Sequence, residues 1–117
     1  MIKRSTIDIM EFERPTRNSA RARRAYSATP EELTSAVERA VENLPRWTLE
    51  SSTDGELIAT RKTGLLRFTD DVTIRILSRG STSEAHFESA SRVGKGDLGQ
   101  NPRNLEELLE AINRKLD

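Results

Sequence analysis

The sequence contains no cysteine and only one histidine, His86. The absence of cysteine excludes disulfides, thiolate catalysis and zinc sites built from thiolates. Any metal site would have to be assembled from carboxylates, which favour a hard ion such as magnesium. We therefore predict neither a metal site nor a cofactor.

The chain also lacks long apolar runs and an excess of charge of either sign. The opening segment MIKRSTIDIMEF is basic, but Asp8 and Glu11 interrupt it, and no run approaches the length of a signal core or a membrane span. The 19 Lys and Arg residues balance the 19 Asp and Glu residues. We expect a cytoplasmic protein with no membrane span and no nucleic-acid partner.

A length of 117 residues is typical of one domain, but the composition changes near residue 29. Residues 6–12 alternate in a way that could form a short strand. Residues 13–27 are rich in arginine, with no helical or strand period over the whole stretch. We expect residues 1–28 to form an extended, solvated arm and residues 29–117 to form a single α+β domain. A nucleic-acid arm is the less favoured alternative, because only Tyr26 could stack on bases.

Two amphipathic helices are predicted. Thr29, Pro30 and Glu32 form a capping box with proline at the first helical position, and Pro45 ends this helix. Asn101 followed by Pro102 is a similar start for the second. The apolar stripes consist of Leu33, Ala36, Val37, Ala40, Val41 and Leu44 in the first helix, and Leu105, Leu108, Leu109, Ile112 and Leu116 in the second.

Four strands are expected between the helices. Residues 46–50 and 56–61 flank Asp54-Gly55, which is a hairpin signal. Residues 68–78 and 83–93 form the central hairpin, in a register that pairs Ile76 with Ala85, Ile74 with Phe87 and Val72 with Ser89. The economical fold is a two-layer α+β sandwich, in which two helices cover one face of an antiparallel sheet of about four to five strands. The predicted core is Leu33, Val37, Val41, Leu44, Trp47, Val72, Ile74, Ile76, Phe87, Leu105, Leu108, Leu109 and Ile112.

The same register divides the polar residues between the two faces of the sheet. It puts Asp71 and Arg92 diagonally across the uncovered face, where we expect them to form an ion pair. Asp70 points to the helix side, where we expect it to accept hydrogen bonds from the Ser89 or Ser91 hydroxyls or from loop amides.

The segment Gly94-Lys95-Gly96-Asp97-Leu98-Gly99 matches G-x-G-x-x-G. A dinucleotide fold would need a helix that begins inside this motif and a further strand after it, so we reject that interpretation. Two alternatives remain. The glycine amides, Lys95, Arg92 and the start of the last helix could hold an anion, or the glycines could simply form a tight corner.

Two blocks of the sequence, RFTDDVTIRI and SASRVGKGDLGQN, closely resemble the signature of a bacterial and plastid family called domain of unknown function 1499. Members typically read F-V-D-D-V-E and R-S-A-S-R-V-G-x-S-D-L-G-x-N. The resemblance covers about residues 27–117, and the recurring polar residues fall on Asp70, Asp71, Ser89, Ser91, Arg92, Asp97 and Asn101. The chain differs from the pattern at Glu88, which replaces an arginine, at residues 101–104, which are less basic, and in lacking an Asn-Cys-Val segment. The resemblance implies the fold and the place of the site, and implies no catalytic activity.

These observations favour a non-catalytic module that binds a small anionic ligand or a protein partner. The candidate ligand-binding residues are Arg92, Gly94, Lys95, Gly96, Asp97, Gly99 and Asn101. The candidate structural clamp consists of Asp70, Asp71, Ser89 and Ser91. A metal-assisted hydrolase using Asp70, Asp71 and Asp97 is the alternative, although the first two point to opposite faces and cannot share a proton. A purely structural domain would use the same residues as internal clamps.

Overall fold

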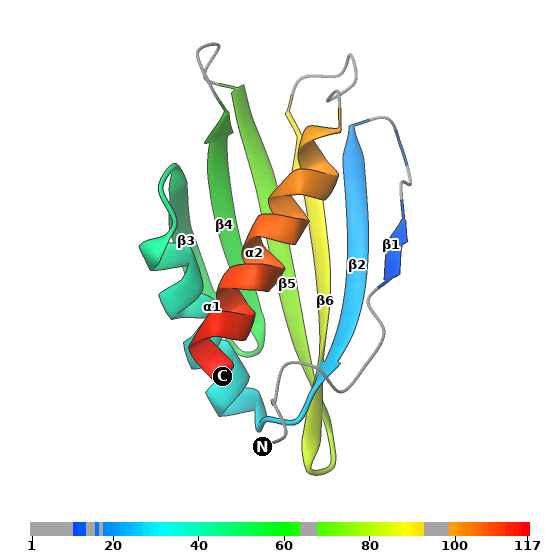
Figure 1. The fold of residues 1–117 in the computed structure, drawn as a ribbon, viewed down its shortest axis with the longest axis vertical. Coiled ribbons are helices and arrows are strands. Elements are labelled where there is room, and N and C mark those ends of the chain that lie inside the picture. Colours follow the sequence, from blue (N-terminus) through cyan, green and yellow to red (C-terminus); the bar gives the residue numbers. More distant parts are fainter. Residues whose placement is uncertain (1–10, 14–15, 17, 64–67, 93–98) are drawn as a thin grey trace.

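The computed structural model describes residues 11–13, 16, 18–63, 68–92 and 99–117. Its two helices and six strands follow the order β-β-α-β-β-β-β-α (Figure 1). The elements are β1 Glu11–Glu13, β2 Ser19–Tyr26, α1 Pro30–Asn43, β3 Trp47–Thr53, β4 Glu56–Thr63, β5 Phe68–Arg79, β6 Thr82–Ser91 and α2 Gln100–Leu116.

All strand pairs are antiparallel, and the strand order across the sheet is β1-β2-β6-β5-β4-β3. Both helices lie on one face, with α2 crossing the sheet diagonally over its middle strands (Figure 1). The predicted α+β sandwich with one covered face is therefore confirmed. The sheet is slightly larger than expected, because strands form before α1 as well as after it.

The expectation of a solvated arm is wrong for Ser19–Tyr26. This segment is β2, an inner strand that pairs with β6 along its whole length. Ala20, Ala22 and Tyr26 alternate toward the core, while Arg21 and Arg23 point to solvent. Alanines are small and only weakly apolar, so the two-residue alternation of a strand is weak in this segment. The segment becomes a strand through its pairing with β6, which the local sequence does not predict. The short strand expected over residues 6–12 lies mostly outside the described residues, and only its last two positions fall in β1.

The start of α1 follows the sequence closely. The Thr29 side chain accepts a hydrogen bond from the Glu32 amide, and the Glu32 carboxylate accepts one from the Thr29 amide. The start of α2 differs from the prediction, because Gly99 occupies the N-cap position with φ of 81°. Asn101 lies inside the first turn, and its side chain points into the protein, as described below.

The central hairpin has the predicted register, with Ile76 opposite Ala85 and Ile74 opposite Phe87. The β3–β4 turn also follows the sequence, because both Asp54 and Gly55 have positive φ. A Cβ atom at Gly55 would lie 3.0 Å from the Ile76 carbonyl oxygen, so only glycine fits there without a shift of the backbone. A β-bulge interrupts the β3 register between Leu49 and Ser51.

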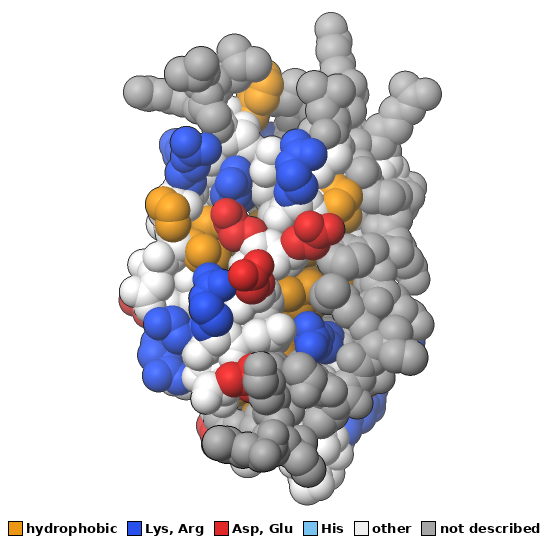
Figure 2. All heavy atoms as spheres, viewed as in Figure 1, with side chains coloured by type: hydrophobic (Ala, Val, Ile, Leu, Met, Phe, Trp, Pro, Cys, Tyr) orange, Lys and Arg blue, Asp and Glu red, His pale blue; other side chains and the backbone are white. Residues whose placement is uncertain are grey.

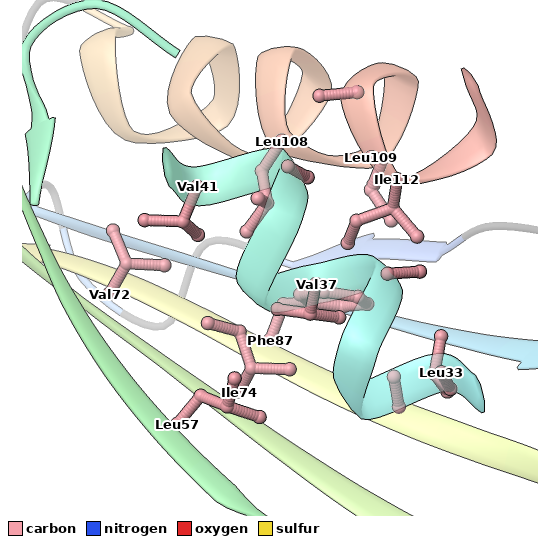
Figure 3. Packing of buried hydrophobic residues seen from close by; sticks show 14 of the residues in the cluster. Leu33, Val37, Val41, Leu57, Val72, Ile74, Phe87, Leu108, Leu109 and Ile112 are labelled. Atoms are coloured by element: carbon pink, nitrogen blue, oxygen red, sulfur yellow. The ribbon is translucent and has the colours of Figure 1, made fainter. Parts of the chain in front are cut away.

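The core lies between the helices and the covered face of the sheet (Figure 3). Of the thirteen predicted core residues, twelve are buried and Leu44 is partly buried. Tyr26 and Leu57 are fully buried residues that the prediction omitted. Neither helix, among the residues described, combines the length and apolar character needed to cross a membrane.

Candidate functional site

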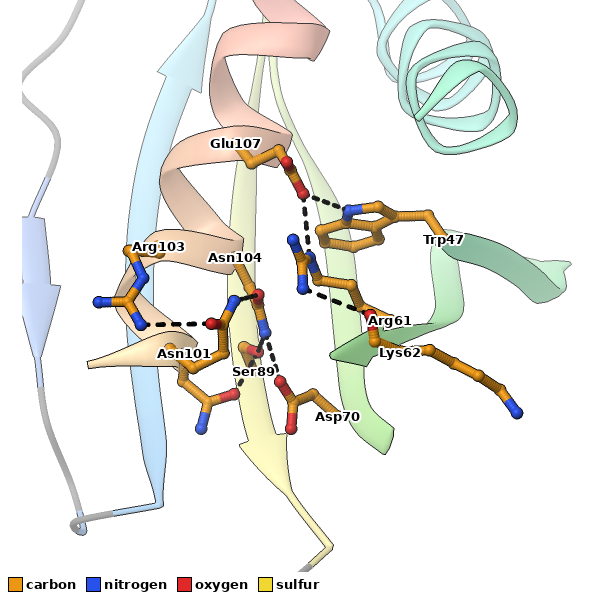
Figure 4. Close-up of polar contacts among 10 residues, drawn as sticks. Trp47, Arg61, Lys62, Asp70, Ser89, Asn101, Arg103, Asn104 and Glu107 are labelled. Atoms are coloured by element: carbon orange, nitrogen blue, oxygen red, sulfur yellow. Dashed lines mark hydrogen bonds and ion pairs between the residues drawn. The ribbon is translucent and has the colours of Figure 1, made fainter. Parts of the chain in front are cut away.

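A buried network of polar side chains joins β5, β6 and α2 near the end of the sheet where β6 connects to α2 (Figure 4). Asp70 is 2% exposed and accepts a hydrogen bond of 2.8 Å from the side-chain amide of Asn104. The same amide donates to the Ser89 hydroxyl at 3.1 Å. The Asn104 oxygen accepts from the Gln100 amide at 2.7 Å. The network therefore fixes the first turn of α2 against two strands.

This arrangement corrects the expected partner of Asp70. The predicted donors were the Ser89 or Ser91 hydroxyls or loop amides, whereas the described donor is Asn104, which links Asp70 to Ser89. The sequence carried a signal for this role. Asn104 precedes Leu108 by four residues and Ile112 by eight, so it lies on the buried stripe of α2, where a polar side chain needs partners.

Asn101 joins the two ends of the connection between β6 and α2. Its oxygen accepts from the Ser89 hydroxyl at 2.6 Å, and its amide donates to the Ser91 hydroxyl at 2.9 Å. The amide also donates to the Asn18 carbonyl at 2.7 Å. The hydrogen bond to Ser91 therefore holds the first turn of α2 against the end of β6.

The Asp71–Arg92 contact that the register predicts is present on the uncovered face. Arg92 donates two parallel hydrogen bonds to the Asp71 carboxylate, at 3.0 and 2.9 Å. The Arg92 amide also donates to the Thr69 carbonyl, which extends the β5–β6 pairing up to the loop. The hydrogen bonds from Arg92 to Asp71 raise the pKa of the guanidinium above its ordinary value. Both side chains remain largely exposed, so solvent screens this pair.

A double-mutant cycle on Asp71→Asn and Arg92→Gln should give favourable coupling at low salt, because the two hydrogen bonds are parallel and charge-assisted. The coupling should decrease at high salt, because the pair is exposed. Urea unfolding of the four variants measures it. The matched control is the exposed single-contact pair Glu110–Arg114 on α2, which should show weaker coupling. Equal coupling for both pairs would contradict a clamping role for Asp71.

The rest of the uncovered face carries an open groove of about 700 Å³ across four strands. Its charged residues form ion pairs within the chain, including Arg21 with Glu88 at 2.7 Å and Arg75 with Glu56 at 3.0 Å. Burial opposes ionisation of Glu84 at the end of this face. Hydrogen bonds from Arg79 and His86 outweigh that effect, so the pKa of Glu84 lies below its ordinary value. This face therefore has the character of a solvated sheet surface with internally neutralised charge.

A second polar contact holds α2 on the same face of the sheet, closer to the β3 edge (Figure 4). The Glu107 carboxylate accepts hydrogen bonds from the Trp47 indole at 2.5 Å and from the Arg61 guanidinium at 3.0 Å. These residues come from α2, β3 and β4. Together with the Asp70 network, these hydrogen bonds link α2 to β3, β4, β5 and β6.

The start of α2 has an unusual charge arrangement. Its N-cap residue, Gly99, has no side chain that could accept from the first amides, and its first turn contains no acidic residue. Arg103 lies close to this point, because its guanidinium would be 3.2 Å from a Cβ atom at Gly99 and donates to the Gln100 side chain at 3.2 Å. The N-terminal end of a helix is electropositive, so an arginine there adds like charge. Arg103 is not among the site residues predicted from the sequence.

The candidate residues therefore separate into groups. Asp70, Ser89, Ser91 and Asn101 are brought together on the helix side, while Asp71 and Arg92 form a pair on the opposite face. Gly99 is the N-cap of α2. Gly94, Lys95, Gly96 and Asp97 lie outside the described residues. Among the residues described, no group of three His, Cys, Asp or Glu side chains could hold a metal ion.

These features define a class of fold, an open antiparallel sheet with two helices on one face. CalU16 from Micromonospora echinospora has a similar structure, with a TM-score of 0.65 and 14% identity over 95% of this chain and 76% of that one. A Rhodobacter sphaeroides protein has the same score and identity over 93% and 95% of the respective chains. A protein of the START superfamily from Mycobacterium smegmatis has a TM-score of 0.51 and 11% identity over 85% and 97%. These similarities show the fold alone.

Within this fold class, residues 7–112 match the family described as Protein of unknown function (DUF1499), and the chain belongs to that family. The resemblance seen in the two sequence blocks is therefore confirmed. The match begins at residue 7, well before residue 27, where the resemblance was expected to begin. Comparison with curated proteins finds no match.

Proposed function

We propose that this chain is a non-catalytic binding module that takes a small anionic ligand at the corner between β6 and α2. The observation that carries the proposal is Arg103 at the N-terminus of α2, where the N-cap residue is a glycine and the first turn of the helix contains no carboxylate. An anion at this point would offset the combined positive charge of the helix end and the guanidinium.

The clamp residues support this function indirectly. The Asn101–Ser91 hydrogen bond and the Asp71–Arg92 pair hold both ends of the connection that contains Gly94, Lys95, Gly96 and Asp97. A loop whose ends are fixed loses less conformational freedom when it binds a ligand. We infer that Lys95 and the glycine amides contact the anion. Asn101 and Arg92 would contribute indirectly, because they hold the two ends of the connection in place.

Basic side chains near the start of α2 support the proposal. Figure 2 shows acidic side chains grouped over the middle of the helix side, with basic side chains toward the end where α2 begins and also toward the opposite end. By contrast, no specific observation favours the hydrolase. Asp70 is engaged by Asn104 and Asp71 by Arg92, on opposite faces of the sheet.

Titration of isotope-labelled protein with inorganic phosphate tests the proposal. We expect saturable shifts of the Gly99 to Arg103 amides, and at least about tenfold weaker binding in Arg103→Gln, which loses a charge-assisted contact. Arg114→Gln, which removes another exposed arginine from the last turn of α2, is the matched control and should bind as the wild type does. The proposal would be contradicted by amide shifts that never saturate, or by an equal loss of phosphate affinity in the two variants. Either result would mean that the shifts report a general effect of ionic strength.

A further inference from the structure

The only histidine in the chain lies in the middle of the uncovered face of the sheet. His86 belongs to β6, where it lies directly opposite Arg23 of β2 on one side and Arg75 of β5 on the other. The other charged residues at neighbouring positions of this face are Glu11 of β1, Arg21 of β2, Glu56 of β4, Arg79 of β5, and Glu84 and Glu88 of β6. Like charges directly opposite one another destabilise a sheet, so a protonated imidazole at this position needs a carboxylate in contact with it.

Glu84 supplies that carboxylate. Its Oε1 atom lies 2.7 Å from His86 Nε2, and its Oε2 atom accepts a hydrogen bond of 3.2 Å from Arg79. The Glu84 side chain is 19% exposed, so solvent screens these contacts less than it screens the more exposed ion pairs of this face. Burial opposes its ionisation, but the hydrogen bonds from Arg79 and His86 outweigh burial and keep the pKa of Glu84 below its ordinary value. Glu84 is therefore charged throughout the pH range in which histidine titrates.

These contacts join a projecting part of the β5–β6 hairpin to the body of the sheet (Figure 1). β4 pairs with β5 only as far as Arg75, so residues 77–82 extend beyond β4. Arg79 belongs to this projecting part, whereas His86 lies in the body of the sheet between β2 and β5. Glu84 contacts both side chains and so connects the projecting part to the body.

We propose that His86 and Glu84 form a pH-sensitive latch, which holds the projecting part of the hairpin more firmly at mildly acidic pH. Protonation adds a positive charge to an imidazole that already contacts the Glu84 carboxylate, so the contact gains a Coulomb attraction. This stabilisation is present below the pH range in which histidine titrates and is lost as the pH rises through that range. It is also lost in stronger acid, where Glu84 takes up a proton. The latch therefore acts between the two titrations.

The two arginines opposite His86 make the sign of the pH effect depend on Glu84. With the carboxylate present, protonation of His86 strengthens the contact that holds the hairpin. In Glu84→Gln, the protonated imidazole would lie between Arg23 and Arg75 after its contacting carboxylate has been removed, so acidification should loosen this region. A hydrogen bond without a role for the histidine charge would give no such reversal.

Hydrogen exchange of the Leu77 amide tests the latch. The Ile76 amide donates to the Gly55 carbonyl on the β4 side, and backbone direction alternates along a strand, so the Leu77 amide points to β6. The measured quantity is the protection factor of Leu77, which is corrected for the intrinsic effect of pH, divided by that of Thr73 in the middle of β5. In wild type, this ratio should be about two- to fivefold higher at about pH 5.5 than at about pH 8. In Glu84→Gln, it should fall on acidification.

His86→Gln is the matched control, because glutamine keeps a side-chain amide donor but does not titrate. Its Leu77-to-Thr73 ratio should be the same at both pH values. The proposal would be overturned by a wild-type ratio that does not change with pH, by an equal change in His86→Gln, or by a rise on acidification in Glu84→Gln.

Salt provides a test on the wild-type protein alone, in case Glu84→Gln does not fold. At about 1 M ionic strength the screening length falls to about 3 Å, so the pH effect on the Leu77-to-Thr73 ratio should shrink. A pH effect that keeps its full size in salt would overturn the latch, because it could not arise from the charge on His86.

Discussion

Removal of residues 1–26 is expected to abolish cooperative folding. The deletion takes away β2, which lies between β1 and β6 and pairs with eight residues of β6. It also removes Tyr26, and loss of one fully buried aromatic side chain costs about 3–5 kcal/mol. The total stability of a domain is only about 5–15 kcal/mol, so the loss of a whole inner strand should exceed what the remainder supplies.

Circular dichroism during thermal unfolding measures this effect. The truncated chain should show no cooperative transition, while a shorter deletion of residues 1–10 should keep one, because it leaves β2 in place. If the chain without residues 1–26 unfolded cooperatively near the wild-type temperature, β2 would be a dispensable addition to the sheet.

Asn104→Leu is expected to destabilise the protein by about 3 kcal/mol, because it leaves the buried Asp70 carboxyl group without its described donor. The matched control is Asn43→Leu on α1, where an exposed asparagine bonds the Arg39 carbonyl, and its effect should stay within about 0.5 kcal/mol. Chemical denaturation measures both free energies of unfolding.

The double variant Asp70→Leu with Asn104→Leu separates the loss of the partner from the loss of shape. Replacing both members of a buried polar pair with apolar groups removes the unsatisfied group, so the double variant should be more stable than Asn104→Leu alone. A double variant that is as unstable as the sum of the two single variants would mean that Asp70 and Asn104 contribute independently.

The sequence predicted most of the fold because its strongest signals were local. The capping box at Thr29, the Asp54-Gly55 turn and the alternation around Ile74 each depend on residues close together in the chain. In the central hairpin, the apolar residues of both strands must face the core, and only one pairing register allows this. The core on the helix side could then be predicted, because the sheet has only one apolar face against which the apolar stripes of the helices can pack.

The features that the sequence did not predict depend on contacts between distant segments. Ser19–Tyr26 becomes a strand because β6 offers it an edge, and its alanines carry little intrinsic preference. Asn101 looked like an N-cap because a proline follows it, but Gly99 takes that place and frees the Asn101 side chain to reach Asn18. In the candidate site, Asp71 and Arg92 followed from the register, whereas Asn104 and Arg103 became relevant only once α2 was positioned over the strands.

The bulge in β3 affects how folded copies meet one another. β3 is the outermost strand on its side of the sheet, and its register shifts between Leu49 and Ser51. A flat, regular edge would present a continuous row of backbone donors and acceptors on which a second molecule could add a strand, and then a third. The bulge twists this row and divides it into two short pieces, and the Glu50 carboxylate at the break accepts a hydrogen bond from Thr60. We therefore expect resistance to fibril growth through this edge to depend on the extra residue, so that deletion of Glu50 would promote assembly even if each molecule still folded.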